Sequence, residues 1–194
     1  MKHIRALIFD LDGTLVTSTL DFAQIRAELG CSAQQDVLEF VEQLSGAERI
    51  EAQEIIHRHE VRDAESSEWL PGAKAFVHAC RSAGMPLAIV TRNSDYSSRI
   101  KMSRNGIPIP YLVTRENSKP KPDPEALHQI AHAFSLDTAS IMMVGDYRYD
   151  LEAGRNASMS TCLVNFDTMP EYAELADYRF NNFEQFHRAF FEAS

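Results

Sequence analysis

Five short runs of apolar residues are spaced along the chain and predict β-strands. Each run is nearly continuous rather than alternating, which is typical of parallel strands that are buried on both faces. The runs are IRALIF (4–9), MPLAIVT (85–91), PYLVT (110–114), SIMMVGD (140–146) and STCLVNF (160–166).

Segments with helical spacing separate the strands from about Pro71 onward. Several of them end in Gly or Asn, which commonly terminate helices. Regular alternation of strand and helix is the signature of right-handed βαβ units, so we expect a three-layer α/β fold with a Rossmann-like parallel sheet. The segments are PGAKAFVHACRSAG (71–84), SDYSSRIKMSRNG (94–106), DPEALHQIAHAFS (123–135) and RYDLEAGRNA (148–157).

The stretch between the first two strands breaks this rhythm. It reads as three consecutive helices with no strand among them, over DFAQIRAELG (21–30), AQQDVLEFVEQLSG (33–46) and AERIEAQEIIHRHEVRDAE (47–65). The sequence therefore predicts a core formed by residues 1–16 and 70–194, with a small helical unit, residues 17–69, inserted into it.

Composition narrows the possible functions. The chain has 194 residues, 44% of them hydrophobic, and a formal net charge of -9. That charge argues against binding nucleic acid, which requires a basic face. The N-terminal apolar run is too short for a signal peptide or a membrane span, so we expect a cytoplasmic protein with no membrane partner. The pattern carries no prediction of the oligomeric state.

Two carboxylates, Asp10 and Asp12, follow the first strand at once. In an open parallel sheet, the carboxyl ends of the strands meet in one crevice where ligands bind. Thr91, Lys119 and Asp146 are expected to lie in or near the same crevice, because each follows another predicted strand. Taken alone, the aspartates are also compatible with an ordinary strand-to-turn exit.

Four segments in order resemble the motifs of the haloacid dehalogenase superfamily of phosphatases, in the subfamily with a helical C1-type cap. They are DLDGTL (10–15), IVTRN (89–93), SKPKPDP (118–124) and VGDYRYD (144–150). The resemblance covers nearly the whole chain, and phosphoglycolate phosphatase-like enzymes are the nearest subgroup. It implies a Mg²⁺-dependent phosphomonoesterase that hydrolyses a small phosphorylated metabolite through an aspartyl-phosphate.

The chemistry of the first and fourth motifs agrees with this resemblance. An ionised aspartate such as Asp10 needs no base to attack phosphorus, but it needs positive charge against repulsion. Asp10, Asp146 and a backbone carbonyl offer the hard oxygens that suit Mg²⁺. By resemblance, Asp12 supplies that carbonyl, and its side chain is the general acid and base. Asp150, one helical turn after Asp146, is expected to orient the lysine or metal-bound water.

The second and third motifs are expected to bind the phosphoryl group. Thr91 is predicted to donate to phosphoryl oxygens together with the backbone amides of Arg92 and Asn93 at a helix N-terminus. The K-P-x-P-D pattern places the superfamily's lysine at Lys119, where an ammonium would balance phosphate and Asp10. Lys121 is its competitor.

Positive side chains in residues 17–69 are candidates for substrate recognition, because a lid supplies contacts beyond the phosphate. Most are expected to be solvated, and one or two to face the crevice. The candidates are Arg26, Arg49, His57, Arg58, His59 and Arg62.

Alternative functions share parts of this pattern. Dehalogenases of the superfamily lack the second aspartate of the first motif, so Asp12 argues against that reaction. A β-phosphoglucomutase-like phosphomutase shares every core motif and stays open. A binding protein that kept the fold and lost turnover is disfavoured by the joint presence of the motif residues.

Overall fold

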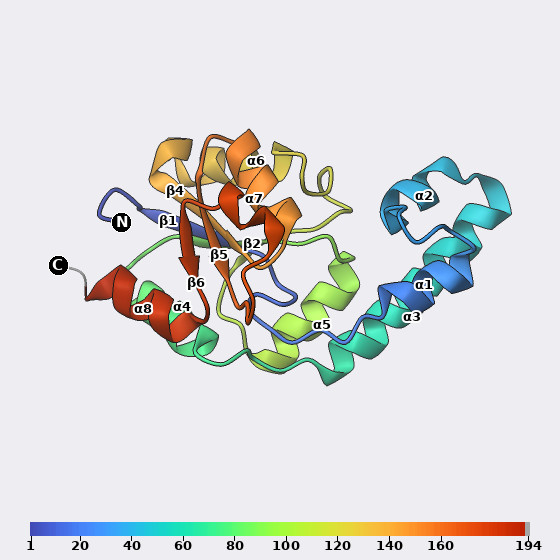
Figure 1. Ribbon diagram of the computed structural model, residues 1–194, viewed down its shortest axis with the longest axis horizontal. Helices are drawn as coiled ribbons and strands as arrows, with labels where there is room; N and C mark the ends of the chain where they lie inside the picture. The colour runs from blue at the N-terminus through green and yellow to red at the C-terminus, as the bar shows by residue number, and fades with distance from the viewer. Residues whose placement is uncertain (193–194) are drawn as a thin grey trace.

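Six parallel strands form one sheet in the computed structural model, which describes residues 1–192 (Figure 1). Their order across the sheet is β3-β2-β1-β4-β5-β6, so the chain leaves the central strand β1 first to one side and then to the other. The strands are β1 (Ala6–Phe9), β2 (Leu87–Val90), β3 (Tyr111–Val113), β4 (Ile141–Gly145), β5 (Ser160–Val164) and β6 (Tyr178–Phe180). The predicted three-layer α/β fold is confirmed.

Eight α-helices and two short 3₁₀ helices connect the strands in the described residues. The helices are α1 (Phe22–Leu29), α2 (Val37–Gln43), α3 (Gly46–Ser66), α4 (Ala73–Ser82), α5 (Asp95–Asn105), α6 (Glu125–Phe134), α7 (Arg148–Asn156) and α8 (Phe183–Phe191), and the 3₁₀ helices are η1 (Thr138–Ser140) and η2 (Glu171–Leu175). Within residues 1–192, none of these helices combines the length and apolar character that crossing a membrane requires.

Both faces of the sheet are buried, which explains the continuous apolar runs. Leu7 and Phe9 of β1 point to one face, where α4 and α8 pack. Ala6 and Ile8 point to the other face and pack against α6 and α7 (Figure 1). Successive side chains of a strand alternate in this way, so one short strand contributes to two hydrophobic cores.

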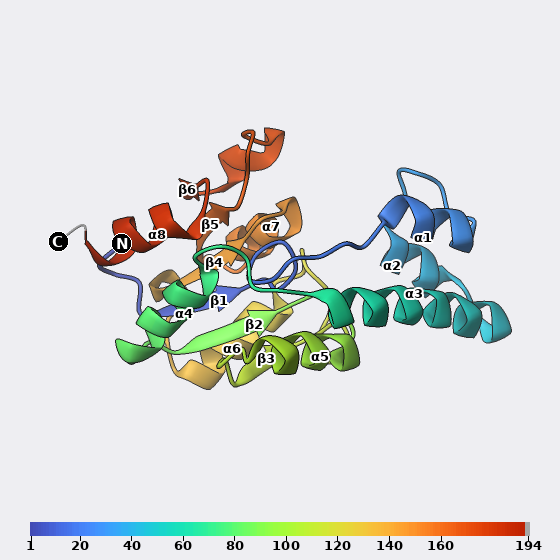
Figure 2. The same ribbon diagram turned by 90° about the horizontal axis from the view of Figure 1, so that it is seen from below.

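The helices α1, α2 and α3 form an insertion that lies to one side of the sheet (Figure 2). Their apolar side chains make a core of their own, which includes Ile25, Val41 and Ile56. The two linkers of this insertion run side by side, because Val16 pairs with Trp69 in an antiparallel bridge. The insertion therefore leaves and rejoins the sheet at almost the same place.

The last strand and the last helix extend the fold beyond the five strands that the sequence predicts. Strand β6 has three residues, and all of them are at least partly exposed at the edge of the sheet. Helix α8 buries Phe183 and Phe186 against Phe76 of α4, with ring centroids 5.5 and 4.4 Å from that of Phe76. This aromatic cluster closes one face of the sheet.

Gly154 of α7 tests how tightly the other face is packed. A Cβ atom at this position would lie 2.6 Å from the Thr161 methyl carbon and 3.1 Å from Met143 Cβ, so neighbouring strands would have to move. We expect Gly154→Ala to destabilise the protein by about 1–3 kcal/mol, despite the better helix propensity of alanine. Urea denaturation measures this, with Arg155→Ala on the exposed side of α7 as the control. A Gly154→Ala protein more stable than the parent would contradict the expectation.

Candidate active site

The carboxyl ends of β1 and β4 meet where the strand order reverses, and the candidate site lies there. Asp10 follows β1 and Asp146 follows β4, and these two strands are direct neighbours. A cavity of about 650 Å³ opens between this edge of the sheet and the helical insertion. It is lined by seven predicted site residues and one competitor: Asp10, Asp12, Thr91, Arg92, Asn93, Asp146, Asp150 and Lys121.

Lys121 is the lysine of this site, and the prediction of Lys119 is wrong. Lys121 is buried, and its Nζ donates to Asp10 Oδ1 at 2.6 Å, to Asp150 Oδ1 at 2.6 Å and to the Val90 carbonyl at 2.7 Å. The Lys119 side chain is 71% exposed and lies 3.8 Å from Asp123. Lys119 is therefore a solvated loop residue.

A repeated motif caused this error. The segment KPKPDP contains K-P-x-P twice, starting at Lys119 and at Lys121. The second copy is followed within four residues by α6 and lies closer to the sheet. Burial of one ammonium and exposure of the other distinguishes the copies, and the sequence pattern alone does not express burial.

Lys121 is held in its charged form by its partners. Burial lowers the pKa of its ammonium, but the charges and hydrogen bonds of Asp10 and Asp150 outweigh this and raise it above the ordinary value. An ammonium that stays charged at neutral pH can balance the carboxylates and an incoming phosphate.

Asp146 lies beside two other carboxylates, those of Asp10 and Asp150. Its Oδ1 accepts a hydrogen bond of 2.7 Å from Thr14. Burial, and then the charges of Asp10 and Asp150, raise the pKa of Asp146 well above its ordinary value. Gly13 lies against its carboxylate, where any Cβ atom would collide with the Asp146 oxygens. A glycine at this turn therefore gives Asp146 its place beside Asp10.

Asp150 is fixed by two donors. Besides Lys121, the backbone N–H of Tyr147 donates to its Oδ2 at 3.0 Å, an arrangement that caps the N-terminus of α7. Burial raises the pKa of Asp150 to about 6, in spite of Lys121. With both oxygens engaged, Asp150 positions Lys121.

The donor set fits a divalent cation. Carboxylate oxygens of Asp10, Asp146 and Asp150 lie within 4.8 Å of one another. Hard carboxylate oxygens are the ligands that Mg²⁺ prefers, and Asp146 lies close to two further carboxylates, those of Asp10 and Asp150. The acidic cluster can therefore hold a metal ion, and Asp10 and Asp146 each have one carboxylate oxygen that accepts no hydrogen bond from residues 1–192.

Asp12 lies beside Asp10 with both carboxylate oxygens bound. Lys101 of α5 donates to Oδ1 at 2.5 Å, and the Asn93 amide donates to Oδ2 at 2.8 Å. Burial raises the pKa of Asp12 to about 6, and Lys101 and Asn93 act in the opposite direction. A carboxyl group with such a pKa exchanges protons readily near neutral pH.

The residues after β2 meet the same cavity. Thr91 is buried, and its Oγ1 accepts a hydrogen bond of 3.1 Å from the Asn93 backbone N–H. Ser94 then caps α5 by accepting from the Ser97 backbone N–H. Thr91, Arg92 and Asn93 thus approach the N-terminus of a helix, where backbone amides favour anions.

The Arg92 side chain points away from that role and toward the insertion. Its Nη2 lies 2.8 and 2.6 Å from the two oxygens of Asp36, the N-cap residue of α2. The guanidinium also stacks on the Tyr149 ring, 4.3 Å from its centroid, and the Tyr149 hydroxyl donates to Asp36 at 3.3 Å. This group joins the insertion to the core at one side of the cavity.

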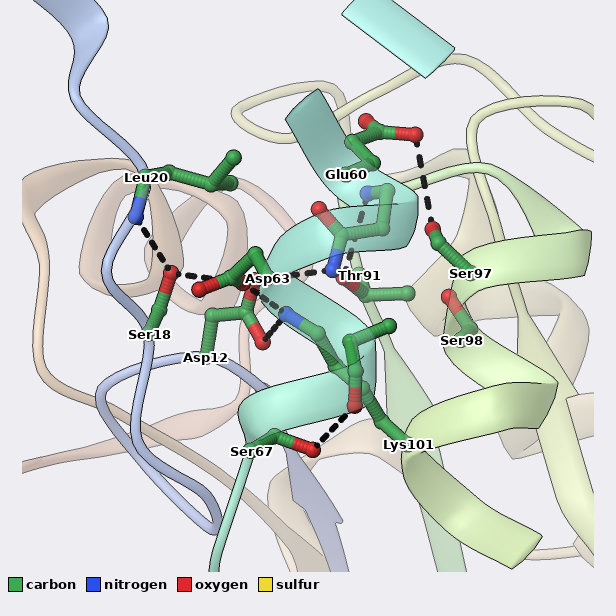
Figure 3. Close-up of polar contacts among 12 residues, drawn as sticks. Asp12, Ser18, Leu20, Glu60, Asp63, Ser67, Thr91, Ser97, Ser98 and Lys101 are labelled. Atoms are coloured by element: carbon green, nitrogen blue, oxygen red, sulfur yellow. Dashed lines mark hydrogen bonds and ion pairs between the residues drawn. The ribbon is translucent and has the colours of Figure 1, made fainter. Parts of the chain in front are cut away.

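A second set of contacts joins α3 to α5 at the base of the insertion (Figure 3). Asp63 of α3 accepts from Lys101 at 2.5 Å. One turn earlier, Glu60 forms an ion pair with Arg115 and accepts from the Ser94 backbone N–H at 3.3 Å. Glu60, Asp63 and Lys101 are all buried.

Sequence reasoning missed Lys101, Asp36 and Asp63 as members of the site. Asp36 had a usable signal, since an aspartate before an apolar helix is a typical N-cap residue. Lys101 and Asp63 had none, because charged residues on helices are most often exposed.

One of the six positive candidates in the insertion faces the site. Arg26 lines the cavity that contains Asp10, and its Nε donates to the Gln35 carbonyl at 3.1 Å. Arg49 and His57 line a separate cavity of about 450 Å³. Arg58 and His59 bind Glu28, and neither they nor Arg62 line the larger cavity.

Comparison with known proteins agrees with this geometry. Residues 7–164 match the family model described as haloacid dehalogenase-like hydrolase. The chain belongs to this family. As a haloacid dehalogenase-like hydrolase, it carries its nucleophile candidate, Asp10, after β1, inside the matched region.

Relatives of this hydrolase include named phosphatases. The chain is 31% identical to the pyrophosphatase PpaX of Bacillus velezensis, over 84% of each chain. It is 27% identical to the phosphoglycolate phosphatase of Cupriavidus necator, over 83% of this chain and 80% of the relative. The crystal structure of a predicted phosphoglycolate phosphatase from Haemophilus somnus superposes with a TM-score of 0.76, at 19% identity and over 100% of both chains. The expected enzyme class, a phosphatase of the family, is thereby supported.

We expect Lys121→Met to destabilise the hydrolase by about 3–5 kcal/mol at pH 7, because it leaves the buried carboxylates of Asp10 and Asp150 without their ammonium. Lys119→Met is the matched control and should change the stability by less than about 0.5 kcal/mol. Urea denaturation of both variants in a chelator measures the difference. Equal effects of the two substitutions would show that Lys121 is not the charge-balancing lysine.

Asp146→Asn should change how stability depends on pH. A group whose pKa is raised by folding stabilises the protein fully below its unfolded pKa, about 4, and this contribution is lost as the pH rises through the folded value. In a chelator, the melting temperature of Asp146→Asn relative to the parent should therefore increase between pH 5 and pH 7.5.

The same variant tests the metal site, because saturating Mg²⁺ should raise the melting temperature of the parent and leave that of Asp146→Asn nearly unchanged. Asp137→Asn, at an exposed position, is the control. A difference between Asp146→Asn and the parent that is constant with pH, or equal stabilisation by Mg²⁺, would contradict the assignment.

Proposed function

We propose that this hydrolase is a Mg²⁺-dependent phosphomonoesterase that acts on a small phosphorylated metabolite through an aspartyl-phosphate. The observation that carries the proposal is the arrangement around Asp10. A largely buried carboxylate faces a cavity, bonded to a buried ammonium and close to a second carboxylate, that of Asp146. This arrangement suits attack by a carboxylate on a dianionic phosphate.

In the first step, Asp10 is the nucleophile. Lys121 donates to Oδ1, and we assign the attack on phosphorus to Oδ2. The bond between Asp10 and phosphorus forms as the ester bond to the leaving oxygen breaks. The leaving oxygen takes the electron pair and receives a proton from Asp12, whose pKa of about 6 leaves a usable protonated fraction near neutral pH.

In the second step, Asp12 is the base. It removes a proton from water, the water oxygen attacks phosphorus, and the bond between Asp10 and phosphorus breaks. Asp10 returns to its carboxylate form and inorganic phosphate leaves. One carboxyl group thus gives a proton in the first step and takes one in the second, which restores the enzyme.

Phosphoryl oxygens are proposed to bind at the start of α5, near the charge of Lys121, whose three N–H groups already donate to Asp10, Asp150 and Val90. We assign the Thr91 hydroxyl and the backbone amides of Arg92 and Asn93 as donors to phosphoryl oxygens, the Asn93 amide exchanging its contact with Thr91 Oγ1 for the phosphate. Lys121 offsets part of the negative charge that Asp10 and the phosphate bring together. Lys119 has no part in this site.

Asp10 and Asp146, with the Asp12 backbone carbonyl, are the groups that would hold Mg²⁺. The metal ion would supply positive charge that offsets repulsion between the phosphate and the carboxylates. We assign Mg²⁺ rather than a softer metal because the donors are oxygens alone.

The insertion, residues 17–69, is proposed to act as a cap over a core formed by residues 1–16 and 70–194. A cavity of about 650 Å³ suits a small metabolite. Among the cap's positive residues, Arg26 is placed to contact the part of the substrate beyond the phosphate. The relatives named above act as phosphatases by name, which favours hydrolysis over transfer within a sugar phosphate.

The test is hydrolysis of p-nitrophenyl phosphate and of a panel of phosphorylated metabolites. Activity should require Mg²⁺ and disappear with excess chelator. Asp10→Asn should lower kcat by at least about a thousandfold while the melting curve stays close to that of the parent, because an amide is a poor nucleophile. Acid-quenched parent enzyme should carry phosphate on Asp10, detected by mass spectrometry. Turnover by Asp10→Asn at the parental rate would exclude the aspartyl-phosphate route.

A further inference from the structure

A buried lysine outside the four motifs contacts the proposed acid and base. Lys101 lies on α5 and is fully buried, and its Nζ is 2.5 Å from Asp12 Oδ1 and 2.5 Å from Asp63 Oδ2. Figure 3 shows the side chain reaching from α5 between these two carboxylates. Burying an ammonium is costly unless it is paired, so its two short contacts fix its position.

The far partner, Asp63, is itself held in place. Its oxygens accept from the Ser18 hydroxyl at 3.0 Å and from the backbone N–H and hydroxyl of Thr19, at 2.5 and 3.0 Å. Burial raises the pKa of Asp63, but Lys101 and Thr19 together lower it below its ordinary value, so it stays ionised at neutral pH. Asp63, the carboxylate that binds Lys101, therefore lies on α3 and accepts hydrogen bonds from the first linker of the insertion.

We propose that Lys101 is a positioning residue for Asp12, anchored by Asp63. It acts through Asp12, and it is not placed to touch phosphorus, because it is fully buried and does not line the cavity. Lys101 donates to Oδ1 of Asp12 and the Asn93 side-chain amide donates to Oδ2, and these two contacts together fix the orientation of the carboxyl group. Proton transfer requires such alignment, since a misplacement of about 1 Å can cost about a hundredfold in rate.

Asp63 gives this positioning a link to the insertion. Lys101, which orients Asp12, is bound by Asp63 of α3, and Asp63 is in turn bound by the first linker. The base of the insertion and the orientation of Asp12 therefore share one network of polar contacts. A cap that shifts at this linker changes the partners of Asp63, and through Lys101 the geometry of Asp12. The proposal rests on the function assigned above to Asp12.

The test is a double-mutant cycle between Lys101→Met and Asp12→Asn, with an alkyl phosphate as substrate. Lys101→Met should lower kcat about 30- to 100-fold with KM changed less than about threefold. On the Asp12→Asn background, the same substitution should lower kcat less than about threefold, because residues that act as a unit are not additive. Lys74→Met, at an exposed position on α4, is the control. Equal losses on both backgrounds would show a merely structural role.

The leaving group provides a second readout. p-Nitrophenolate needs almost no protonation, so the first turnover of p-nitrophenyl phosphate by Lys101→Met should stay within about threefold of the parent. If Lys101→Met slows this turnover as much as it slows the alkyl ester, Lys101 does not act through proton transfer, and the proposal is overturned. If Asp12→Asn alone leaves the alkyl ester's turnover unchanged, the proposed role of Asp12 fails instead.

A third readout needs no activity. Crystal structures of the parent and of Lys101→Met should differ in the orientation of the Asp12 carboxyl group, and an unchanged orientation would contradict the proposal. Where Lys101→Met does not fold, Lys101→Met with Asp63→Asn removes one of the two carboxylates left without an ammonium and keeps an acceptor oxygen for Thr19. Asp63→Asn alone, which leaves Lys101 on Asp12, should lower kcat less than Lys101→Met does.

Discussion

The charge balance around Lys121 is the interaction on which the rest of the site depends. Asp10, Asp146 and Asp150 crowd together at the ends of β1 and β4, and repulsion among them would otherwise favour protonation or separation. One buried ammonium, bonded to Asp10, Asp150 and the end of β2, draws three elements to one point. Three carboxylates are thus held together at the carboxyl ends of the strands. Lys121 bonds to Asp10 and Asp150, and Asp146 is the one of the three to which it does not bond.

A second ammonium repeats this arrangement on the side of the insertion. Lys101 joins Asp12 to Asp63 much as Lys121 joins Asp10 to Asp150, so each aspartate of the first motif has a lysine and a remote carboxylate behind it. The two lysines come from different elements, α5 and the loop before α6. The proposed nucleophile and the proposed proton carrier are therefore each bound by a lysine of their own.

Sequence alone predicted the fold well, because buried parallel strands are recorded as apolar runs and the three inserted helices as a gap in the alternation. It missed β6, whose three residues lie at an exposed edge. At the site, two overlapping motifs made both Lys119 and Lys121 candidates for the active-site lysine. Only the structure distinguishes them, because it shows that Lys121 is buried and Lys119 is exposed. Lys101 was invisible because the buried face of α5 is polar, with Ser97 and Ser98 beside the lysine.

The paired linkers of the insertion have an evolutionary meaning. Val16 bridges Trp69, the Thr17 N–H donates to the Glu68 carbonyl and the Leu70 N–H to the Leu15 carbonyl, so chain enters and leaves through one two-stranded neck. Residues 17–69 begin and end at paired positions next to the sheet, as the residues of a hairpin loop do. The parts of this segment away from Asp36 and Asp63 can change in length or sequence while strand register and the contacts of the crevice carboxylates stay as they are. One core can thus accept different substrates when the segment inserted between these paired linkers changes.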